Sequence, residues 1–209
     1  MRFAGKIGLA VLTAWALGAC HADAGDKPDL AVAAGPLALT ITLSPPQLEG
    51  LMIAEGRLEL HHVSLFGDVS ADNRTMLGET GLGLPKDALD VTFPSAPYGL
   101  YSRVQTSVDD VQLHGAWRGT PLEVGFEVES FHTIDLRGPA LDYEPTMGAR
   151  FTMPIDANQW FDAARLDVAT VTDGAIHVNW QENVELTQAL VTAVEASFSL
   201  DGTSGPMDR

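Results

Sequence analysis

The sequence predicts a mainly β protein: an antiparallel β-sandwich with a short helix near residues 156–163 and a C-terminal helix near residues 184–197. Many short segments alternate apolar and polar residues, which is the period of a half-buried strand. Turn-forming residues separate these segments, and helix-start signals come only late in the chain. The length of 209 residues and the hydrophobic content of 45% suit one core, so we expect a single domain over residues 37–200.

The first predicted strand is "LALTITL", residues 37–43, in which every second residue is large and apolar. The next is "RLELHHVSLFG", residues 57–67, whose apolar residues change face in the middle of the segment. Such a change of phase within one strand is what a β-bulge produces. We therefore expect a bulge, or a switch between sheets, near His61 and His62.

Three further segments continue the pattern. Residues 88–93 alternate, and residues 101–117 form a long predicted strand whose phase changes at Asp109 and Asp110. Residues 120–130, "TPLEVGFEVES", show the clearest alternation, with apolar residues predicted to face a core and glutamates to face water.

Residues 150–155, "RFTMPI", alternate in the same way and form the next predicted strand. The dipeptide Asp173-Gly174 lies between two apolar runs, a pattern that favours a type I′ β-hairpin. After this turn we expect Ile176, Val178 and Trp180 to point inward.

Two helices are predicted late in the chain. Asp156 followed three residues later by Gln159 is close to a capping box, so a short helix is expected there. Asn183 is predicted to cap the second helix, with Glu185 at the positive end of its dipole. The apolar face of this helix carries Leu186, Leu190 and Val194.

The start of the chain predicts export. Arg2 and Lys6 precede an uncharged apolar run over residues 7–17, about half of the roughly 20 residues that a membrane-spanning helix needs. A basic start, a short apolar run and a small-residue ending are typical of a secretory signal peptide.

The four residues Leu17, Gly18, Ala19 and Cys20 resemble the lipobox of bacterial lipoproteins. The resemblance implies cleavage before Cys20, attachment of diacylglycerol to its sulfur and a membrane anchor, because acyl chains bind bilayers strongly. Cys20 is the one cysteine of the sequence, which excludes an internal disulfide. The alternative is a soluble secreted protein with a free thiol.

This interpretation divides the chain into a signal peptide (residues 1–19), a lipidated tether (residues 20–36), the β domain and a flexible tail (residues 201–209). It places the protein in the envelope of a Gram-negative bacterium, with the outer membrane favoured because His21, not aspartate, follows the cysteine. The net charge of −16 excludes a nucleic-acid-binding protein, since phosphate contacts require clusters of Lys and Arg.

The body of the chain resembles a group of uncharacterised bacterial envelope lipoproteins. The segments that carry the resemblance are "RLELHHVSLFG", "APYGLYSRVQTSVDDVQLHGAW", "DANQWFDAARLDVATVTDGAIHVNW" and "ALVTAVEASFSL". The resemblance implies a β-sandwich like prealbumin or carbohydrate-binding modules. It implies no reaction and no functional residues.

One segment has the spacing of a calcium loop. Asp68, Ser70, Asp72 and Glu79 occupy positions 1, 3, 5 and 12 of an EF-hand, where oxygen ligands wrap a hard cation. Position 6 is Asn73 instead of glycine, and a strand precedes the segment where an EF-hand has a helix. An acidic solvated loop is the alternative interpretation.

The histidines offer no metal-ligand spacing. His61 and His62 are neighbours in a strand and point to opposite faces unless the bulge redirects one of them. His114, His132 and His177 are scattered, so ordinary strand histidines are the default interpretation.

Three aromatic residues at turns or strand ends, Tyr98, Tyr101 and Trp117, are candidates for stacking on a sugar ring. Packing in the core or at a sheet edge is the alternative, because buried aromatics dominate β cores. No catalytic motif is present: there is no nucleophile elbow, no H-E-x-x-H and no P-loop.

The sequence therefore predicts a lipid-anchored envelope protein, a non-catalytic binding or structural module that is not an enzyme and needs no cofactor. A glycan-binding module and a divalent-cation-binding protein are the alternatives, with a glycan or another envelope protein as possible partners.

Overall fold

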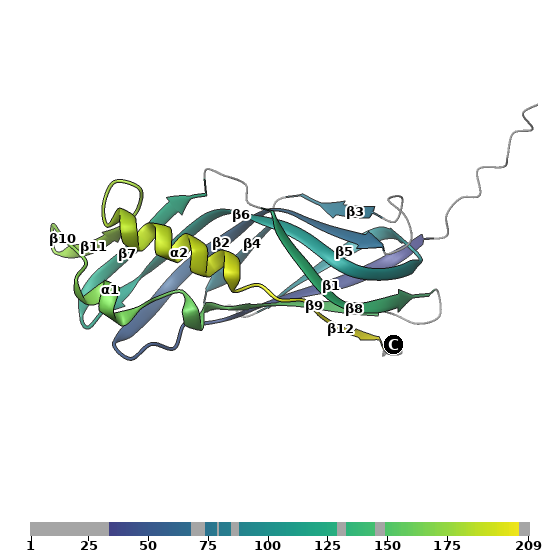
Figure 1. Cartoon of the computed structure of the whole chain (residues 1–209), viewed down its shortest axis with the longest axis horizontal. Helices are drawn as coiled ribbons and strands as arrows, with labels where there is room; N and C mark the ends of the chain where they lie inside the picture. The colour runs from purple at the N-terminus through teal and green to yellow at the C-terminus, as the bar shows by residue number, and fades with distance from the viewer. Residues whose placement is uncertain are drawn as a thin grey trace, which may run out of the picture. The chain divides into compact units, whose positions relative to one another are not determined.

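The fold was analysed in a computed structural model that describes residues 34–67, 74–78, 80–84, 88–128, 133–144 and 149–204. Most of these residues lie in strands, and the helices come late in the chain (Figure 1). The strands are β1 (Ala34–Ser44), β2 (Leu51–Gly67), β3 (Arg74–Leu77), β4 (Thr80–Leu84), β5 (Ala88–Pro97), β6 (Gly99–Trp117), β7 (Thr120–Glu127), β8 (Ile134–Tyr143), β9 (Ala149–Asp156), β10 (Val171–Thr172), β11 (Ala175–Val178) and β12 (Asp201–Ser204). The helices are the 3-10 helix η1 (Ala157–Gln159), α1 (Ala163–Asp167) and α2 (Val184–Ala196).

The strands form two sheets, so the predicted mainly β fold is confirmed. The smaller sheet has the order β12-β9-β1-β5. Its strand β1 buries every second residue, as predicted, and pairs antiparallel with β5. The residues of β1 that enter the core are Leu37, Leu39, Ile41 and Leu43.

The expectation of a purely antiparallel arrangement is wrong at two places. Strand β1 runs parallel to β9, and β7 runs parallel to β11. A period-two pattern reports which face of a strand is buried and is silent about the direction of its neighbour. In both pairs a long stretch of chain connects the two strands, which is what parallel neighbours require.

The larger sheet is built around two long strands. Strand β2 pairs antiparallel with β6 from Leu51 opposite Trp117 to Gly67 opposite Tyr101. Both strands are longer than the other strands that pair with them. Strands β4 and β3 therefore pair one after the other with β2, and β7 and β8 pair with different halves of β6. The second half of β6 therefore faces β7, and its first half faces β8.

Both predicted phase changes are confirmed as irregularities of the β2–β6 ladder. The register shifts between Glu59 and Leu60 and again between Leu60 and His62. At the first shift β6 skips Asp109, whose carbonyl oxygen instead accepts a hydrogen bond of 2.8 Å from the N–H of Val128. The extra residues let both strands keep apolar side chains in the core on either side of the bulge.

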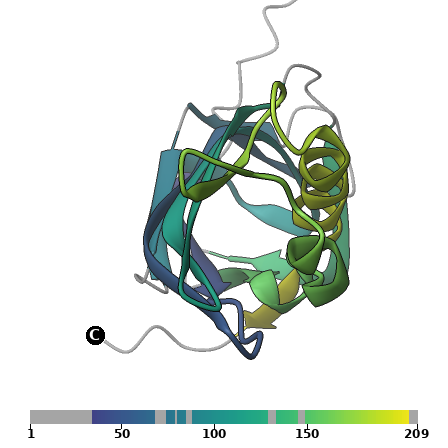
Figure 2. The same cartoon turned by 90° about the vertical axis from the view of Figure 1, so that its left-hand side faces the viewer.

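The two sheets and α2 contribute to one hydrophobic core. Leu39 of β1, Leu122 of β7 and Leu190 of α2 belong to the same buried cluster. The edge strands of the two sheets also approach each other, β12 beside β8 and β3 beside β5. Seen from one end, the sheets and the yellow helix α2 are arranged around a common centre (Figure 2). Helix α2 packs beside β11, at the end of the larger sheet that the smaller sheet leaves uncovered (Figure 1).

The predicted helix near residues 156–163 is two separate pieces. Asp156 does cap a helix, since its carboxylate accepts a hydrogen bond of 3.1 Å from the N–H of Asn158, but this 3-10 helix ends at Gln159. A second carboxylate, that of Asp162, accepts a bond of 2.8 Å from the N–H of Ala164 and starts α1. Between the caps, Trp160 and Phe161 are buried.

The C-terminal helix is confirmed, and Asn183 lies at its N-cap position as predicted, but its side chain does not cap the helix. Asn183 precedes α2 with left-handed backbone angles (φ 53°, ψ 43°), and its side chain makes no capping hydrogen bond. The hairpin at Asp173-Gly174 is confirmed, and both turn residues have the positive φ that a type I′ turn requires, 53° and 86°. Trp180 does not point inward as predicted, because 37% of it is exposed.

The domain limits differ from the prediction at both ends. Strand β1 begins at Ala34, inside the predicted tether, and β12 pairs with β9 inside the predicted flexible tail. The lipobox residues Leu17, Gly18, Ala19 and Cys20 lie outside the described residues. Within the described part of the chain, no helix combines the length and the apolar character that crossing a membrane takes.

Candidate functional site

A polar hollow lies on the outer face of the larger sheet, over β6, β7 and β11. Strand β7 buries Leu122 and Phe126 and turns Glu123 and Glu127 to solvent, so this face is opposite to the one that α2 covers. The hollow has a volume of about 420 Å³, and we call it the polar concavity. It is lined by Asp110, Gln112, His114, Glu123, Val124, Gly125, Phe126, Glu127, His177 and Asn179.

Gly125 keeps the centre of the polar concavity open. It pairs with Gln112 on β6, and a Cβ atom at this position would meet no other atom within 4 Å. Any larger residue would project into the hollow from the middle of its floor. A glycine is otherwise unfavourable inside a strand, because it adds no packing and costs chain entropy.

One row of the polar concavity places acidic and imidazole groups alternately on neighbouring strands. His114 of β6 pairs with Glu123 of β7, and Glu123 pairs with His177 of β11. Glu55 of β2 extends the row, since it pairs with His114 from the other side. The His177 Nδ1 atom lies 3.2 Å from a Glu123 carboxylate oxygen. Directly paired residues bring their Cβ atoms within about 4.5–5.5 Å.

A second row brings three carboxylates together. Asp110 pairs with Glu59 on β2 and with Glu127 on β7. Partial burial raises the pKa of the Asp110 carboxyl, and the negative charges of Glu59 and Glu127 raise it further, whereas a hydrogen bond of 2.7 Å from the Gln112 amide opposes this rise. Glu59 forms an ion pair with Arg57, and the other two carboxylates of the row favour a positively charged ligand.

Strand β11, which carries His177, is held in place by Asn183. The Asn183 side chain accepts a hydrogen bond of 2.7 Å from the Thr170 N–H, and its amide donates bonds of 3.0 Å to the Thr170 carbonyl and 2.8 Å to the His177 carbonyl. Trp180 follows β11 and donates 2.8 Å from its indole N–H to the Glu127 carbonyl. These contacts fix the border of the polar concavity to β7 and α2.

A Ser–His pair elsewhere in the larger sheet does not form a reactive site. The Ser107 Oγ atom lies 3.3 Å from Nδ1 of His62, at the bulge. Ser107 is completely buried, so its hydroxyl cannot meet a substrate from solvent. Thr106, beside it, donates 2.7 Å to the His62 carbonyl. We interpret these groups as buried polar residues whose hydrogen bonds are satisfied within the sheet.

The stacking role predicted for Tyr101 and Trp117 is corrected by their burial. Tyr101 is 0% exposed and Trp117 is 4% exposed, so neither presents a ring face to a sugar. The Tyr101 hydroxyl donates 2.7 Å to the Pro97 carbonyl, and burial raises its pKa to about 12, with a smaller contribution from Tyr143. Tyr98 is partly buried and packs against Tyr143, with the ring centroids 4.8 Å apart. The alternation of their strands could not reveal this, because ring burial depends on the facing sheet.

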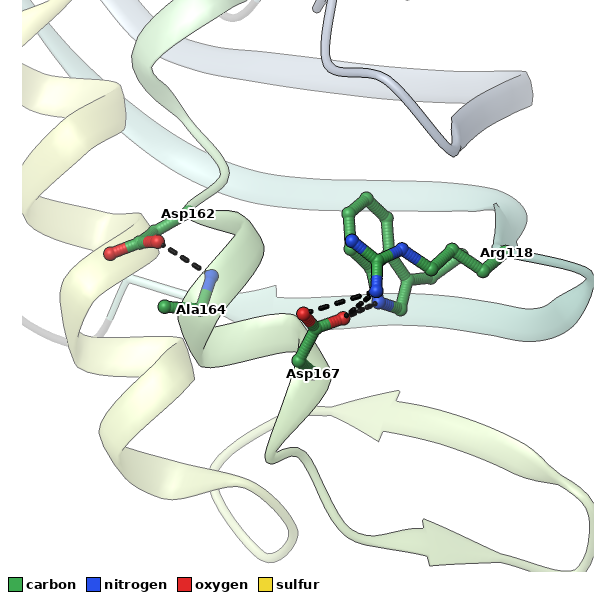
Figure 3. A network of polar contacts seen from close by, with 5 residues as sticks. Arg118, Asp162, Ala164 and Asp167 are labelled. Atoms are coloured by element: carbon green, nitrogen blue, oxygen red, sulfur yellow. Dashed lines mark hydrogen bonds and ion pairs between the residues drawn. The ribbon is translucent and has the colours of Figure 1, made fainter.

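Trp117 instead joins the β6–β7 turn to α1 through Asp167. Its indole N–H donates 3.0 Å to the Asp167 carboxylate. The Arg118 guanidinium lies 2.9 Å from the same carboxylate and over the Trp117 ring (Figure 3). Asp162 starts the helix and Asp167 ends it, so the two carboxylates fix both ends of α1 (Figure 3).

The other predicted ligand residues fall elsewhere. Asp68, Ser70, Asp72 and Glu79, the residues with calcium-loop spacing, lie outside the described residues. As the side chains lie, no three histidine, cysteine, aspartate or glutamate groups of the described residues converge closely enough to hold a metal ion.

Sequence reasoning missed the row of Glu55, His114, Glu123 and His177. The alternation of each strand already showed that Glu123 faces water. What it could not show was that β7 lies between β6 and β11, which is a fact of sheet order. Only this order places residues that are more than 60 positions apart on one line.

A second hollow, of about 260 Å³, lies between α1 and the start of α2. Its lining mixes apolar side chains with Arg165 and Glu185, and Val168 within it is 82% exposed. It lacks the aligned ionisable groups of the polar concavity, which is therefore the better candidate site.

Compared with known proteins, the chain matches no family model, no curated protein and no solved structure.

Proposed function

We propose that the protein is a non-catalytic binding module, and that its ligand is a positively charged group that enters the polar concavity. The observation that carries the proposal is the carboxylate row of Glu59, Asp110 and Glu127 on adjacent strands, beside the aligned Glu123. Of these, Asp110, Glu123 and Glu127 line the hollow around Gly125. A net charge of −16 adds long-range attraction for cations.

The geometry supports binding better than catalysis. The polar concavity is open to solvent, and His114, Glu123 and Glu127 are exposed, whereas a site closed to water strengthens the electrostatic interactions that catalysis uses. A cation needs only convergent oxygen atoms and negative potential. We therefore assign the carboxylates to recognition.

The proposed module is a β-sandwich whose two sheets enclose the common core. This finer description is supported by the inward faces of β1 and β7, which both contribute to one buried cluster. Helix α2 would then complete the sandwich where the smaller sheet stops.

We also propose that the module is exported and anchored by lipid on Cys20, in the outer membrane of a Gram-negative envelope. The support is the sequence Leu17–Cys20 and the apolar run before it. Labelling with a palmitate analogue should mark the wild-type protein and not the Cys20→Ser variant. Equal labelling of both would contradict the anchor.

The binding proposal is tested by thermal shift of the purified full-length protein with Ca²⁺, Mg²⁺ and oligolysine as probes. The double variant Asp110→Asn/Glu127→Gln removes two charges from the polar concavity, and Asp142→Asn/Glu144→Gln removes two exposed charges from the other half of the protein. At least one probe should raise the melting temperature of the wild type and of the control, and raise it less in the first variant. Absence of any shift, or equal shifts in both variants, would refute the proposal.

A glycan-binding role is the second candidate, and one observation favours it. Trp180 is 37% exposed at the border of the polar concavity, where its ring could stack on a sugar. A neutral glycan array should then give a signal that Trp180→Ala abolishes. A signal unaffected by Trp180→Ala would exclude this ring as the platform.

A further inference from the structure

The row His114–Glu123–His177 crosses three adjacent strands with the carboxylate in the middle. His114 is on β6 and His177 on β11, and each pairs directly with Glu123 of β7. All three side chains line the polar concavity. Because paired Cβ atoms lie about 4.5–5.5 Å apart, both imidazole rings can lean toward the space above Glu123.

The side chains are accessible and one half of the arrangement is already formed. The His177 Nδ1 atom and the Glu123 carboxylate are 3.2 Å apart, and their side chains are 26% and 53% exposed. His114 is also exposed. The His114 imidazole reaches the space above Glu123 by rotation about its two side-chain torsions. An exposed side chain changes freely between its rotamers. This rotation is required, because no three such groups of the described residues converge as they lie.

We propose that His114, Glu123 and His177 bind one transition-metal ion, with Zn²⁺ as the representative, in the polar concavity. Two imidazole nitrogens and one carboxylate oxygen form a donor set that Zn²⁺ takes in proteins, leaving a fourth position for water or a ligand. Imidazole ligands favour Zn²⁺, Ni²⁺ and Cu²⁺ over Ca²⁺ and Mg²⁺, which prefer oxygen atoms only. The inference rests on the proposed function, because it places a specific cation in the same hollow.

The nearby groups support this choice of ion. Glu55 pairs with His114 from the side of β2, where it can accept a hydrogen bond from the second ring nitrogen. Gly125 leaves the space beside Glu123 open to an ion and its water. The carboxylates of Asp110 and Glu127 lie in the next row and add negative potential without being ligands.

The test is titration of the metal-free, full-length protein with Zn²⁺ and Ni²⁺ by calorimetry, with Ca²⁺ and Mg²⁺ as comparison ions. The variants are His114→Ala, His177→Ala and the control Asp142→Asn, which removes an exposed charge of β8 outside the polar concavity. We expect saturable Zn²⁺ binding with one equivalent attributable to this site. Each histidine variant should weaken it at least about tenfold, the scale on which even supporting residues of metal sites act, and the control should change it less than about threefold.

Circular dichroism of the metal-free variants shows whether they are folded. If an alanine variant is unfolded, the asparagine variant at the same position, His114→Asn or His177→Asn, is used in its place. X-ray absorption of the Zn²⁺-loaded wild type should show two imidazole ligands, one of which each histidine variant loses. The inference is overturned if Zn²⁺ does not bind, if both folded histidine variants bind it unchanged, or if Ca²⁺ binds as tightly. The two proposals can fail separately. If Zn²⁺ does not bind, but a thermal-shift probe still stabilises the wild type more than Asp110→Asn/Glu127→Gln, this inference is overturned and the proposed function stands.

Discussion

Replacement of Asn183 should destabilise the protein by an amount that its contacts predict. The side chain makes three hydrogen bonds of 2.7–3.0 Å to the backbone of Thr170 and His177. A hydrogen bond contributes roughly 0.5–1.5 kcal/mol net, so their loss costs about 2–3 kcal/mol. The left-handed backbone at this position, with φ 53°, adds roughly 1 kcal/mol for a residue such as alanine. We therefore expect Asn183→Ala to lower the free energy of unfolding by about 3 kcal/mol.

Two matched variants separate these contributions. Asn183→Gly removes the same bonds but accepts the left-handed backbone, and part of this gain is lost to the entropy of glycine in the unfolded chain. It should therefore be more stable than Asn183→Ala by up to about 0.5 kcal/mol. Asn183→Asp keeps the acceptor for the Thr170 N–H and turns an oxygen toward two carbonyl groups, so it should be no more stable than the alanine variant.

The assay is urea unfolding of the purified protein, followed by tryptophan fluorescence and circular dichroism. The control is Gln188→Ala on the exposed side of α2, which should change the free energy of unfolding by less than about 0.5 kcal/mol. A loss below about 1 kcal/mol in Asn183→Ala would mean that the three bonds contribute little. A glycine variant less stable than the alanine variant would refute the argument from backbone conformation.

Three other predictions concern single groups. Burial raises the pKa of Tyr101 above its unfolded value of 10.0 to about 12. Its contribution to the free energy of unfolding should therefore be present below pH 10 and be lost as the pH rises toward 12. Tyr101→Phe should flatten this part of the pH dependence of the urea midpoint. The pKa of Asp110 is also raised, so its charge opposes folding at neutral pH, and Asp110→Asn should raise the melting temperature at pH 7 but not at a pH where the carboxyl is protonated. Asp167→Ala should cost about 1–3 kcal/mol in urea unfolding, because it leaves the buried indole N–H of Trp117 without its acceptor, and a loss no larger than that of Asp162→Ala would contradict this role.

The strands could be predicted from the sequence because burial of one face leaves a local signal. The alternation in β1 and β7, and the phase changes at His61 and Asp109, are consequences of the pleat and of bulges within one segment. Parallel pairing, the position of β11 beside β7 and the approach of β12 to β9 depend on contacts between distant segments. No local pattern contains them.

The failed helix cap has the same kind of cause. Asparagine is favoured before a helix because its oxygen can accept from the first turn. At Asn183 the side chain instead meets Thr170 and His177, which the hairpin of β10 and β11 brings into reach. Three bonds to these partners outweigh one capping bond, so tertiary contacts decide the conformation.

The candidate site was hidden for a related reason, since its rows exist only after the sheet has formed. Glu123 and His177 lie far apart in the chain and meet because β11 docks parallel to β7. Their spacing therefore resembles no motif. Of the three aromatic residues considered for stacking, Tyr101 and Trp117 lie in the core and Tyr98 is partly buried, in keeping with the alternative interpretation of packing.

The polar concavity lies far along β6 from the point where the described chain enters the β domain. The chain enters the β domain at Ala34, opposite Pro97 and close to the start of β6 at Gly99. His114 lies 15 residues further along β6, which at about 3.3 Å per residue separates the entry point from the hollow by roughly 50 Å. The proposed binding site is therefore remote from Ala34, the first described residue of the chain.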